Sequence, residues 1–595
     1  MDLIEHYFFC FPAEDYTIDH PQATTVAEIA DKLHCSERNT KFVLRKMEEQ
    51  RWISWQPGRG RGHRSFITFH RLPKDLLRQQ TEEWLRQGHI QQAIRLLELP
   101  GINESTARAL RQIISAWLGL HTKVNHNRPR DIIRLAFGRH LSALDPLRVS
   151  ITTEVHLARQ LFDTLVRYNL EKKTFEPQIA HHWDCSSDKK QWTFYLRKGI
   201  LFHHGRELTA RDVTFTFNRV MSPSSPCAWY FKELLLIEQA GRYTLRLVFS
   251  RPAGFLLHLL SSIHTAILPA DASFQEEKLI GTGPFQLKSR TKDTLILTRF
   301  ENYYRERMLL DEVAIYYLPH AERSVAIFTQ QKTSSDPVDL QPFTTEECGC
   351  RYLSFNFNKS GPQMNRTFRQ AVRLIFDRQI FLKDLRGDRR QPADSFFRKF
   401  SEQASFTSHP LTEAEVLLKE SGYSGETMQL YCFDQPGSRE DALWLMHRAR
   451  LAGLNLSVHP FPMTDFFNPS IDSKADLLLA GEVFDEDIPL SFISMLKDET
   501  VFFRRFLNAE QRQVVDKIAN ALMACSDEAF YWKMIQQLEG YLREHMIILF
   551  NYHSNQASAF SKELSGIQLN AYGWADFSKL WIKPANNVFT PVKRY

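Results

Sequence analysis

The sequence predicts a multidomain protein with a winged helix-turn-helix domain at about residues 1–72, a helical connector at about 73–130, and a large α/β region at 131–595. Three observations lead to this prediction. The chain of 595 residues is several times longer than one domain. Its basic residues gather in one short segment that has the pattern of two helices and a hairpin. Beyond about Arg130, helix-type and strand-type stretches are mixed, as in α/β proteins.

The basic character belongs to the stretch from Lys32 to Lys74. It holds eleven Lys or Arg residues against three acids, a local excess of eight positive charges. The whole chain carries a formal net charge of +6, so the other residues together carry a net charge of −2. A patch this concentrated is typical of a nucleic-acid contact, although a solvated basic surface is the alternative.

Two short helices are predicted inside this stretch. Thr25 and Glu28 have the spacing of a capping box, and Ser36 is placed to cap a second helix that runs to about Gln50. At 100° per residue, one side of the second helix carries the core residues Thr40, Val43, Leu44 and Met47. The opposite side carries the candidate DNA-binding residues Arg38, Asn39, Lys41, Phe42 and Arg45. Phe42 gains nothing on an exposed face unless a partner covers it.

A β-hairpin with a basic tip follows. Ile53 and Trp55 alternate with polar residues, the glycine-rich stretch 57–63 reverses the chain, and Phe66 to Phe69 resume an extended run. Its candidate DNA-backbone contacts are Arg59, Arg61, His63 and Arg64. A phosphate-binding P-loop would need Gly-Lys-Ser/Thr opening a helix, and that triplet is missing here. The hairpin therefore reads as the wing beside a helix that can enter the major groove.

The stretch "TVAEIADKLHCSERNTKFVLRKMEEQRWISWQPGRGRGHRSFITF" resembles the N-terminal domain of the SgrR family of bacterial transcriptional regulators. The following residues, Asp75 to about Leu120, are similar in style to the connector of that family. The resemblance implies that the protein binds double-stranded promoter DNA.

The remaining chain resembles the periplasmic oligopeptide-, dipeptide- and nickel-binding proteins of ABC importers. The resemblance rests on an ordered series that includes "RQLFDTLVRYN" (159–169), "LIGTGPFQL" (279–287) and "YLSFNFNKSGPQMNRTFRQAVRLIFDR" (352–378). It implies a two-lobed clam-shell, with lobe one at about 131–335 and 550–595 and lobe two at about 336–549. It also implies a small-molecule effector between the lobes, either a sugar phosphate, as the SgrR family suggests, or a short peptide.

Candidate ligand-binding residues are Glu482, Asp485, Asp487, Phe355, Asn356 and Trp574. The three acids lie in "LLLAGEVFDEDIPLSF" (477–492), where the transporter relatives meet the charged end of their ligand. A solvated acidic turn is the alternative for the acids, and core packing is the alternative for the other three residues.

Other classes of protein are disfavoured. No nucleophile motif is visible, so we expect no enzyme. We expect no cofactor and no metal site, because the cysteines lack a paired C-x-x-C and adjacent histidines such as His181 and His182 point to opposite faces of a strand. No apolar run approaches the ~20 residues of a membrane span, and acids at positions 2 and 5 do not fit a secretory signal.

The sequence thus favours a cytoplasmic, ligand-responsive DNA-binding transcriptional regulator. The alternative is a solute-binding component of a peptide-type ABC importer with an N-terminal interaction module. A peptide or sugar-phosphate hydrolase is a third hypothesis, for which no catalytic residue can be named.

Overall fold

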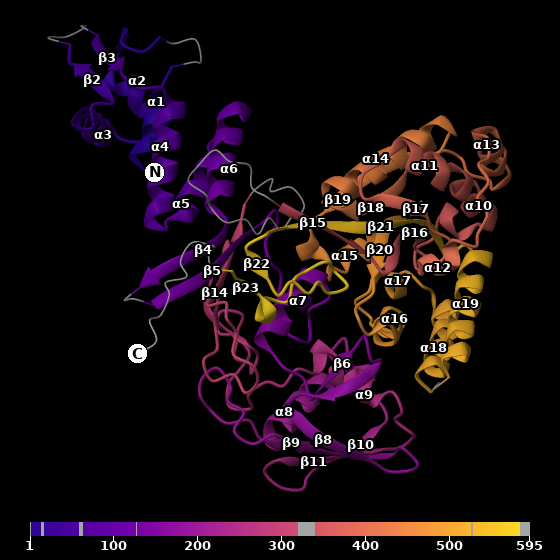
Figure 1. The fold of residues 1–595 in the computed structure, drawn as a ribbon. Helices are drawn as coiled ribbons and strands as arrows, with labels where there is room; N and C mark the ends of the chain where they lie inside the picture. The colour runs from indigo at the N-terminus through magenta and orange to yellow at the C-terminus, as the bar shows by residue number, and fades with distance from the viewer. Residues whose placement is uncertain are drawn as a thin grey trace, which may run out of the picture.

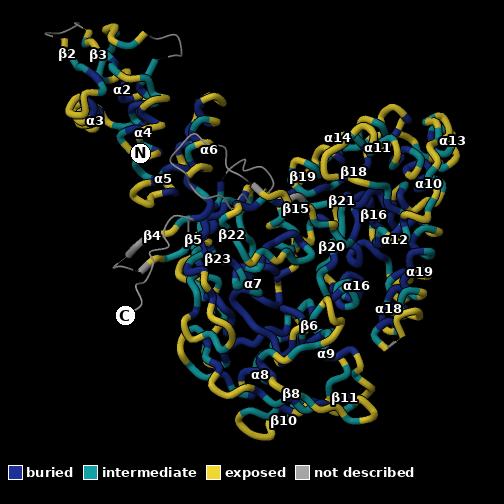
Figure 2. Tube along the Cα trace, viewed as in Figure 1, coloured by how far each residue is buried: buried dark blue, intermediate teal, exposed yellow. Residues whose placement is uncertain are grey.

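A computed structural model describes residues 2–12, 17–58, 64–125, 128–318, 340–524 and 527–583. The N-terminal winged-helix unit stands apart from the two lobes, with the connector helices between them (Figure 1). The largest cores, drawn dark blue in Figure 2, lie inside the lobes. The expected multidomain architecture is confirmed.

The winged-helix unit contains three helices and a three-stranded sheet. Its elements are α1 (Leu3–Cys10), β1 (Pro21–Thr24), α2 (Val26–Lys32), α3 (Glu37–Glu49), β2 (Ile53–Gln56) and β3 (Ser65–Phe69). The sheet order is β1-β3-β2, with both pairs antiparallel. The predicted caps are present: Thr25 Oγ1 accepts from the amide of Glu28 at 3.1 Å, and Ser36 Oγ accepts from the amide of Asn39 at 3.3 Å. These caps satisfy amide groups that the first turn of each helix leaves free.

Helix α1 is part of the same core, which the sequence did not predict. Ile4, Tyr7 and Cys10 are buried together with residues of α3 and β3. The Tyr7 hydroxyl donates to the carbonyl of Arg71 at 2.6 Å, which ties α1 to the start of the connector. Burial raises the pKa of the Cys10 thiol to about 12, so this cysteine is an inert packing residue.

The connector shares its packing with both of its neighbours. It consists of α4 (Pro73–Gln87), α5 (Ile90–Arg95), the 3-10 turn η1 (Leu96–Glu98) and α6 (Glu104–Trp117). Trp84 and Leu97 pack against the winged-helix core and also against a second cluster that contains Trp117 and Tyr316. The winged-helix unit is therefore joined to the lobes by continuous packing.

Lobe one contains two larger sheets. The first has the order β12-β13-β14-β5-β4, and the second has the order β10-β11-β9-β8. Its strands are β4 (Gly119–Asn125), β5 (Arg128–Phe137), β6 (Val166–Asn169), β7 (Thr174–Pro177), β8 (Ala180–Cys185), β9 (Gln191–Leu196), β10 (Leu234–Gln239), β11 (Thr244–Phe249), β12 (Phe285–Arg290), β13 (Thr294–Arg299) and β14 (Glu312–Tyr317). Its helices are α7 (Thr152–Leu161), α8 (Ala210–Val220), η2 (Ala228–Phe231), α9 (Leu256–Ser261) and η3 (Ile263–Thr265).

Lobe two is built on a sheet with the order β15-β21-β16-β20-β18-β19, and β17 pairs with β21. Its strands are β15 (Leu340–Glu346), β16 (Gly349–Phe355), β17 (Arg389–Pro392), β18 (Met428–Phe433), β19 (Leu456–Phe461), β20 (Leu477–Val483) and β21 (Ile548–Ser561). The helices around it are η4 (Pro362–Met364), α10 (Arg366–Ile375), α11 (Arg378–Asp384), α12 (Arg398–Ser401), α13 (Leu411–Glu420), α14 (Pro436–Leu451), η5 (Met463–Asp465), α15 (Ser470–Lys474), α16 (Ile488–Lys497), α17 (Phe502–Arg505), α18 (Ala509–Ala524) and α19 (Glu528–Glu544).

The two lobes are linked through the antiparallel pair β15 and β21, which run side by side in Figure 1. After β21 the chain returns to lobe one through β22 (Leu564–Ser565), η6 (Phe577–Lys579) and β23 (Trp581–Ile582), whose side chains join the lobe-one core. The lobe boundary that we placed near residue 550 falls inside β21, and the connector boundary near 130 falls inside β5.

Two glycines of the "LIGTGPFQL" segment pack against the end of α7. A Cβ atom at Gly283 would lie 2.5 Å from the carbonyl carbon of Leu161, and one at Gly281 would lie 2.1 Å from its carbonyl oxygen. Only glycine fits at these distances, because the obstructing atoms belong to the backbone.

We therefore expect Gly283→Ala to lower the stability of the protein by about 1–3 kcal/mol through overpacking. The matched control is Gly540→Ala in α19, where a Cβ atom meets nothing within 4 Å; it should raise stability by up to about 1 kcal/mol through helix propensity. Thermal denaturation followed by circular dichroism measures both changes. Equal melting temperatures for the two variants would contradict the packing assigned to Gly283.

Candidate functional site

The outer face of α3 has the properties expected of a DNA-reading helix. Thr40, Val43, Leu44 and Met47 are buried, and Arg38, Asn39, Lys41, Phe42 and Arg45 are exposed, as predicted. Figure 2 colours much of α3 as exposed. The Phe42 ring is 55% exposed, and the Lys46 ammonium lies 4.6 Å from its centroid. This distance is within the range of a cation–π contact, so the outer face presents an aromatic ring and a positive charge side by side.

The cations of α3 differ in how they are neutralised. Arg45 forms an ion pair with Glu49 at 3.1 Å, whereas no described residue forms an ion pair with Arg38 or Lys41. Both of these side chains are exposed. Arg38 and Lys41 are therefore the more available positive charges for a nucleic acid.

The wing is held firmly against α3 at its base. The amide of Trp55 donates to the Glu48 carboxylate at 3.0 Å, and the amide of Gly58 donates to the Ser65 hydroxyl at 3.1 Å. Arg64 lies 3.6 Å from the Glu28 carboxylate, and Phe66 is 42% exposed. The candidate residues Arg59, Arg61 and His63 lie outside the described residues, so their roles stay predictions.

Three of the candidate ligand residues are packed inside the lobes. Phe355 is fully buried in lobe two, and Trp574 is buried in lobe one between Phe137 and His156. The Asn356 amide donates to the carbonyls of Asp472 and Ala475 at 2.7 and 2.8 Å. In this conformation these residues stabilise the lobes and present no free surface to a ligand.

Two of the candidate acids bridge the lobes instead. Asp485, which follows β20 in lobe two, receives a bidentate pair of hydrogen bonds from Arg159 on α7 of lobe one. Burial acts against the charge of Arg159, yet Asp485 holds the pKa of this guanidinium above its usual value. Asp487 caps α16 and lies 2.8 and 2.9 Å from Nδ1 of His258 on α9 of lobe one. Both carboxylates therefore already have a cationic or hydrogen-bonding partner.

The third acid, Glu482, faces the interior of lobe two. Tyr352 donates its hydroxyl to the Glu482 carboxyl group at 2.9 Å. Burial raises the pKa of Glu482 to about 7, which keeps a large part of it protonated near neutral pH. This acid does not offer a fixed negative charge to a ligand.

A further inter-lobe contact was not predicted from the sequence. The Trp229 indole in η2 of lobe one donates to the Asp498 carboxyl group at 2.5 Å. Asp498 ends α16 and is buried. Together with Asp485 and Asp487, it makes α16 and the turn before it a part of lobe two that contacts lobe one. The lobe-one partners are Arg159, Trp229 and His258, hundreds of residues away in the sequence, so no local pattern identifies them.

Burial raises the pKa of Asp498 to about 7, against the opposing effects of Trp229 and Arg504. The pKa of Asp498 is higher in the folded protein than in the unfolded chain, so the folded protein binds the proton more tightly. The stability that the protonated Asp498 contributes is therefore lost as the pH rises through about 7. We therefore expect Asp498→Asn to melt at a higher temperature than the wild type, and we expect this difference to be larger at pH 8 than at pH 6.

For an unfolding unit of the size of lobe two, roughly 200 residues, each kcal/mol of stability gained corresponds to a rise in melting temperature of about 2–4 °C. Thermal shift at both pH values measures it, with the exposed Glu420→Gln as the matched control. An equal effect of Asp498→Asn at pH 6 and pH 8 would contradict the raised pKa.

The described residues hold no group of three or more His, Cys, Asp or Glu side chains placed to bind a metal ion. Within the same residues, no helix is both long and apolar enough to cross a membrane.

Comparisons with known proteins agree with this architecture. The family described as "Bacterial extracellular solute-binding proteins, family 5 Middle" matches residues 174–503, and "Sugar transport-related sRNA regulator N-term" matches residues 8–123. YhjP of Bacillus subtilis is 31% identical over 588 residues, covering 98% of this chain and 100% of YhjP. The HTH-type transcriptional regulator SgrR of Yersinia enterocolitica is 28% identical over 570 residues, covering 95% of this chain and 96% of that protein.

A solved structure confirms the fold of the lobes. The periplasmic binding protein DppA of Helicobacter pylori, in complex with the peptide STSA, matches with a TM-score of 0.65 and 19% identity. The match covers 76% of this chain and 98% of DppA. The expected two-lobed solute-binding fold is thereby confirmed. With its SgrR-type N-terminal region joined to a family 5 solute-binding domain, the chain belongs to the SgrR family of bacterial regulators.

Proposed function

We propose that this protein is a transcriptional regulator that binds double-stranded promoter DNA through its winged helix and responds to a small molecule bound by its two lobes. The observation that carries the proposal is the face of α3, where the exposed Arg38, Lys41 and Phe42 sit on a helix held by a buried core. The relative from Yersinia enterocolitica is named as an HTH-type transcriptional regulator, which supports this function.

The proposed effector is a small molecule such as a sugar phosphate or a short peptide. The DppA structure, which is in complex with the peptide STSA, supports a small-molecule ligand for the two lobes. Asp485 and Asp487 are already paired with Arg159 and His258, so these carboxylates would have to exchange partners to bind a peptide amino group. A sugar phosphate has no amino group, so it would not require these carboxylates to exchange partners in this way.

We propose a cytoplasmic location for the protein. Helix α1 supplies three buried residues to the winged-helix core, so removing it as a leader peptide would open that core. The alternative, a solute-binding component of an importer, predicts recovery outside the inner membrane with a processed N-terminus. Cell fractionation followed by N-terminal sequencing separates the two locations.

The exposed cations of α3 are the proposed base-reading residues. The double variant Arg38→Ala, Lys41→Ala should weaken binding to a promoter duplex that the wild type binds and change the base preference, by about 1–3 kcal/mol for each lost base contact. Fluorescence anisotropy at fixed salt measures the affinity. Arg86→Ala in the connector is the matched control, because this arginine is also exposed and lies outside the reading helix.

The arginines of the wing are the proposed contacts to the DNA backbone. Arg59→Ala with Arg61→Ala should reduce affinity for all sequences similarly and lower the slope of log K against log salt by about 1 for each lost phosphate contact. Titrations at three salt concentrations measure this slope. Wild-type binding by the quadruple variant that combines both pairs would overturn the DNA-binding assignment.

The ion pair between Asp485 and Arg159 is proposed to hold the lobes closed. Asp485→Asn removes the charge that pairs with Arg159, so we expect the ligand-free lobes to open and the radius of gyration to rise in small-angle X-ray scattering. Lys173→Ala is the matched control, since the Lys173–Glu528 pair also joins the lobes but is exposed to solvent and contributes little to stability. Equal scattering curves for both variants and the wild type would contradict a closing role for Asp485.

A further inference from the structure

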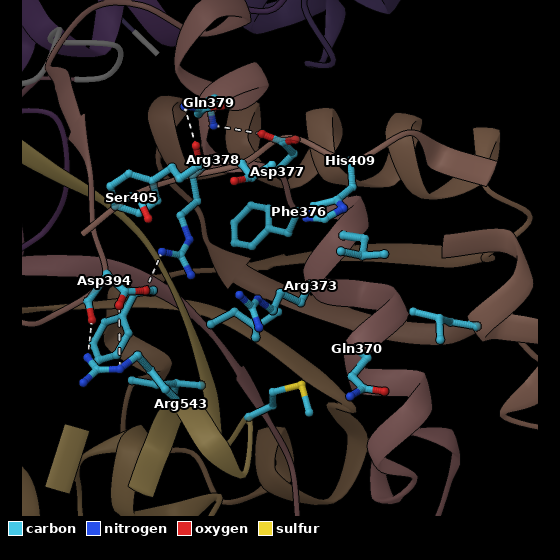
Figure 3. A pocket seen from close by; sticks show the side chains of 18 residues that line it. Gln370, Arg373, Phe376, Asp377, Arg378, Gln379, Asp394, Ser405, His409 and Arg543 are labelled. Carbon is cyan, nitrogen blue, oxygen red and sulfur yellow. Dashed lines mark hydrogen bonds and ion pairs between the residues drawn. The ribbon is translucent and has the colours of Figure 1, made fainter. Parts of the chain in front are cut away.

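A pocket in lobe two lies apart from the contacts between the lobes. It has a volume of about 530 Å³ and is bordered by α10, the loop 405–409, the end of α19 and the start of β21 (Figure 3). This volume is within the range of small-molecule sites. Its wall includes the buried side chains of Phe376, Ile548 and Phe550, which form an apolar surface.

The charged groups of the pocket are unevenly balanced. Its lining holds three arginines, Arg373, Arg378 and Arg543, against two carboxylates, Asp377 and Asp394. The Asp377 carboxylate caps α11 by accepting from the amides of Gln379 and Ile380 at 3.0 and 3.1 Å, so it is committed to the backbone.

Asp394 serves two of the three arginines. It accepts from Arg378 at 2.7 Å, and its other oxygen lies 3.7 Å from Nε of Arg543. The Arg543 guanidinium also donates to the Asp394 carbonyl at 2.5 Å. The Asp394 carboxylate thus pairs with two guanidinium groups, which are also held by the Ala393 carbonyl, 2.7 Å from Arg378, and by Glu539, 3.8 Å from Arg543.

Arg373 is left without a counter-charge. Its side chain has no hydrogen bond or ion pair with any described residue, while the guanidinium groups of Arg373 and Arg378 both extend toward the interior of the pocket (Figure 3). Burial lowers the pKa of Arg378, and the positive charge of Arg373 adds to this effect. The two cations are thus close enough to repel one another, and an anion between them would relieve the repulsion.

The chemistry of the lining defines the ligand class. A guanidinium group binds phosphate and carboxylate through two parallel hydrogen bonds, and Gln370, Ser405 and Thr407 supply further polar groups nearby. The apolar wall suits an uncharged organic body attached to the anion. We propose that this pocket binds a small organic oxyanion, a phosphate or a carboxylate, with Arg373 as its principal charge partner.

The test uses the full-length chain without DNA, with phenyl phosphate, benzoate and phenol as probes at constant ionic strength. Isothermal titration calorimetry measures binding. We expect phenyl phosphate, benzoate or both to bind and uncharged phenol not to bind, and the stronger of the two anions identifies the headgroup. Arg373→Gln should weaken the binding of that anion by about tenfold or more.

Arg390→Gln is the matched control, because Arg390 is an exposed arginine on β17 of the same lobe and does not line the pocket. It should bind the anion as the wild type does. Melting temperatures measured without ligand test whether both variants are folded. We expect both to be folded, because Arg373 is exposed and makes no contact that the fold requires. Binding of neither anion, binding of phenol with equal affinity, or unchanged anion binding by Arg373→Gln would overturn the assignment.

Discussion

The antiparallel pairing of β4 with β5 is the constraint on which the arrangement of the protein depends. Only Leu118 separates the connector helix α6 from β4, which forms the edge of the lobe-one sheet. The guanidinium of the buried Arg134 on β5 lies 3.8 Å from the Trp117 ring at the end of α6 and donates to its carbonyl. A helix that ends in a paired strand cannot swing freely, so the connector keeps a fixed direction relative to lobe one.

The lobes are held together by contacts of another kind. Asp485, Asp487 and Asp498 each reach a polar partner on lobe one, and the two strands β15 and β21 join the lobes covalently. These acids are largely buried, so opening the lobes must hydrate them and their partners again, and closure depends on the balance between that gain in hydration and the lost contacts. A ligand between the lobes can shift this balance only if it binds the closed arrangement more tightly than the open one.

The sequence predicted what depends on local periodicity. The buried and exposed sides of α3 follow from a repeat of 3.6 residues, and the caps at Thr25 and Ser36 follow from the spacing of polar residues. It could not predict the surroundings of Asn356 or Asp485. The partner of Asp485, Arg159, is 326 residues away in the chain, and only the packed lobes bring the two together. The sequence did not predict the role of α1 in the core for the same reason, because Tyr7 contacts Phe69 of β3 only once the chain has folded.

The packing of the connector and the contacts between the lobes limit how a ligand could act on bound DNA. Trp84 and Leu97 pack against both the winged-helix core and the cluster on β14, so the reading helix and lobe one are joined by continuous packing. Under the proposed function, closure would move lobe two relative to lobe one and would leave the exposed face of α3 unchanged. Under the proposed function, the effector therefore changes what lobe two places beside the DNA or beside a second protein, and does not change which bases α3 can read.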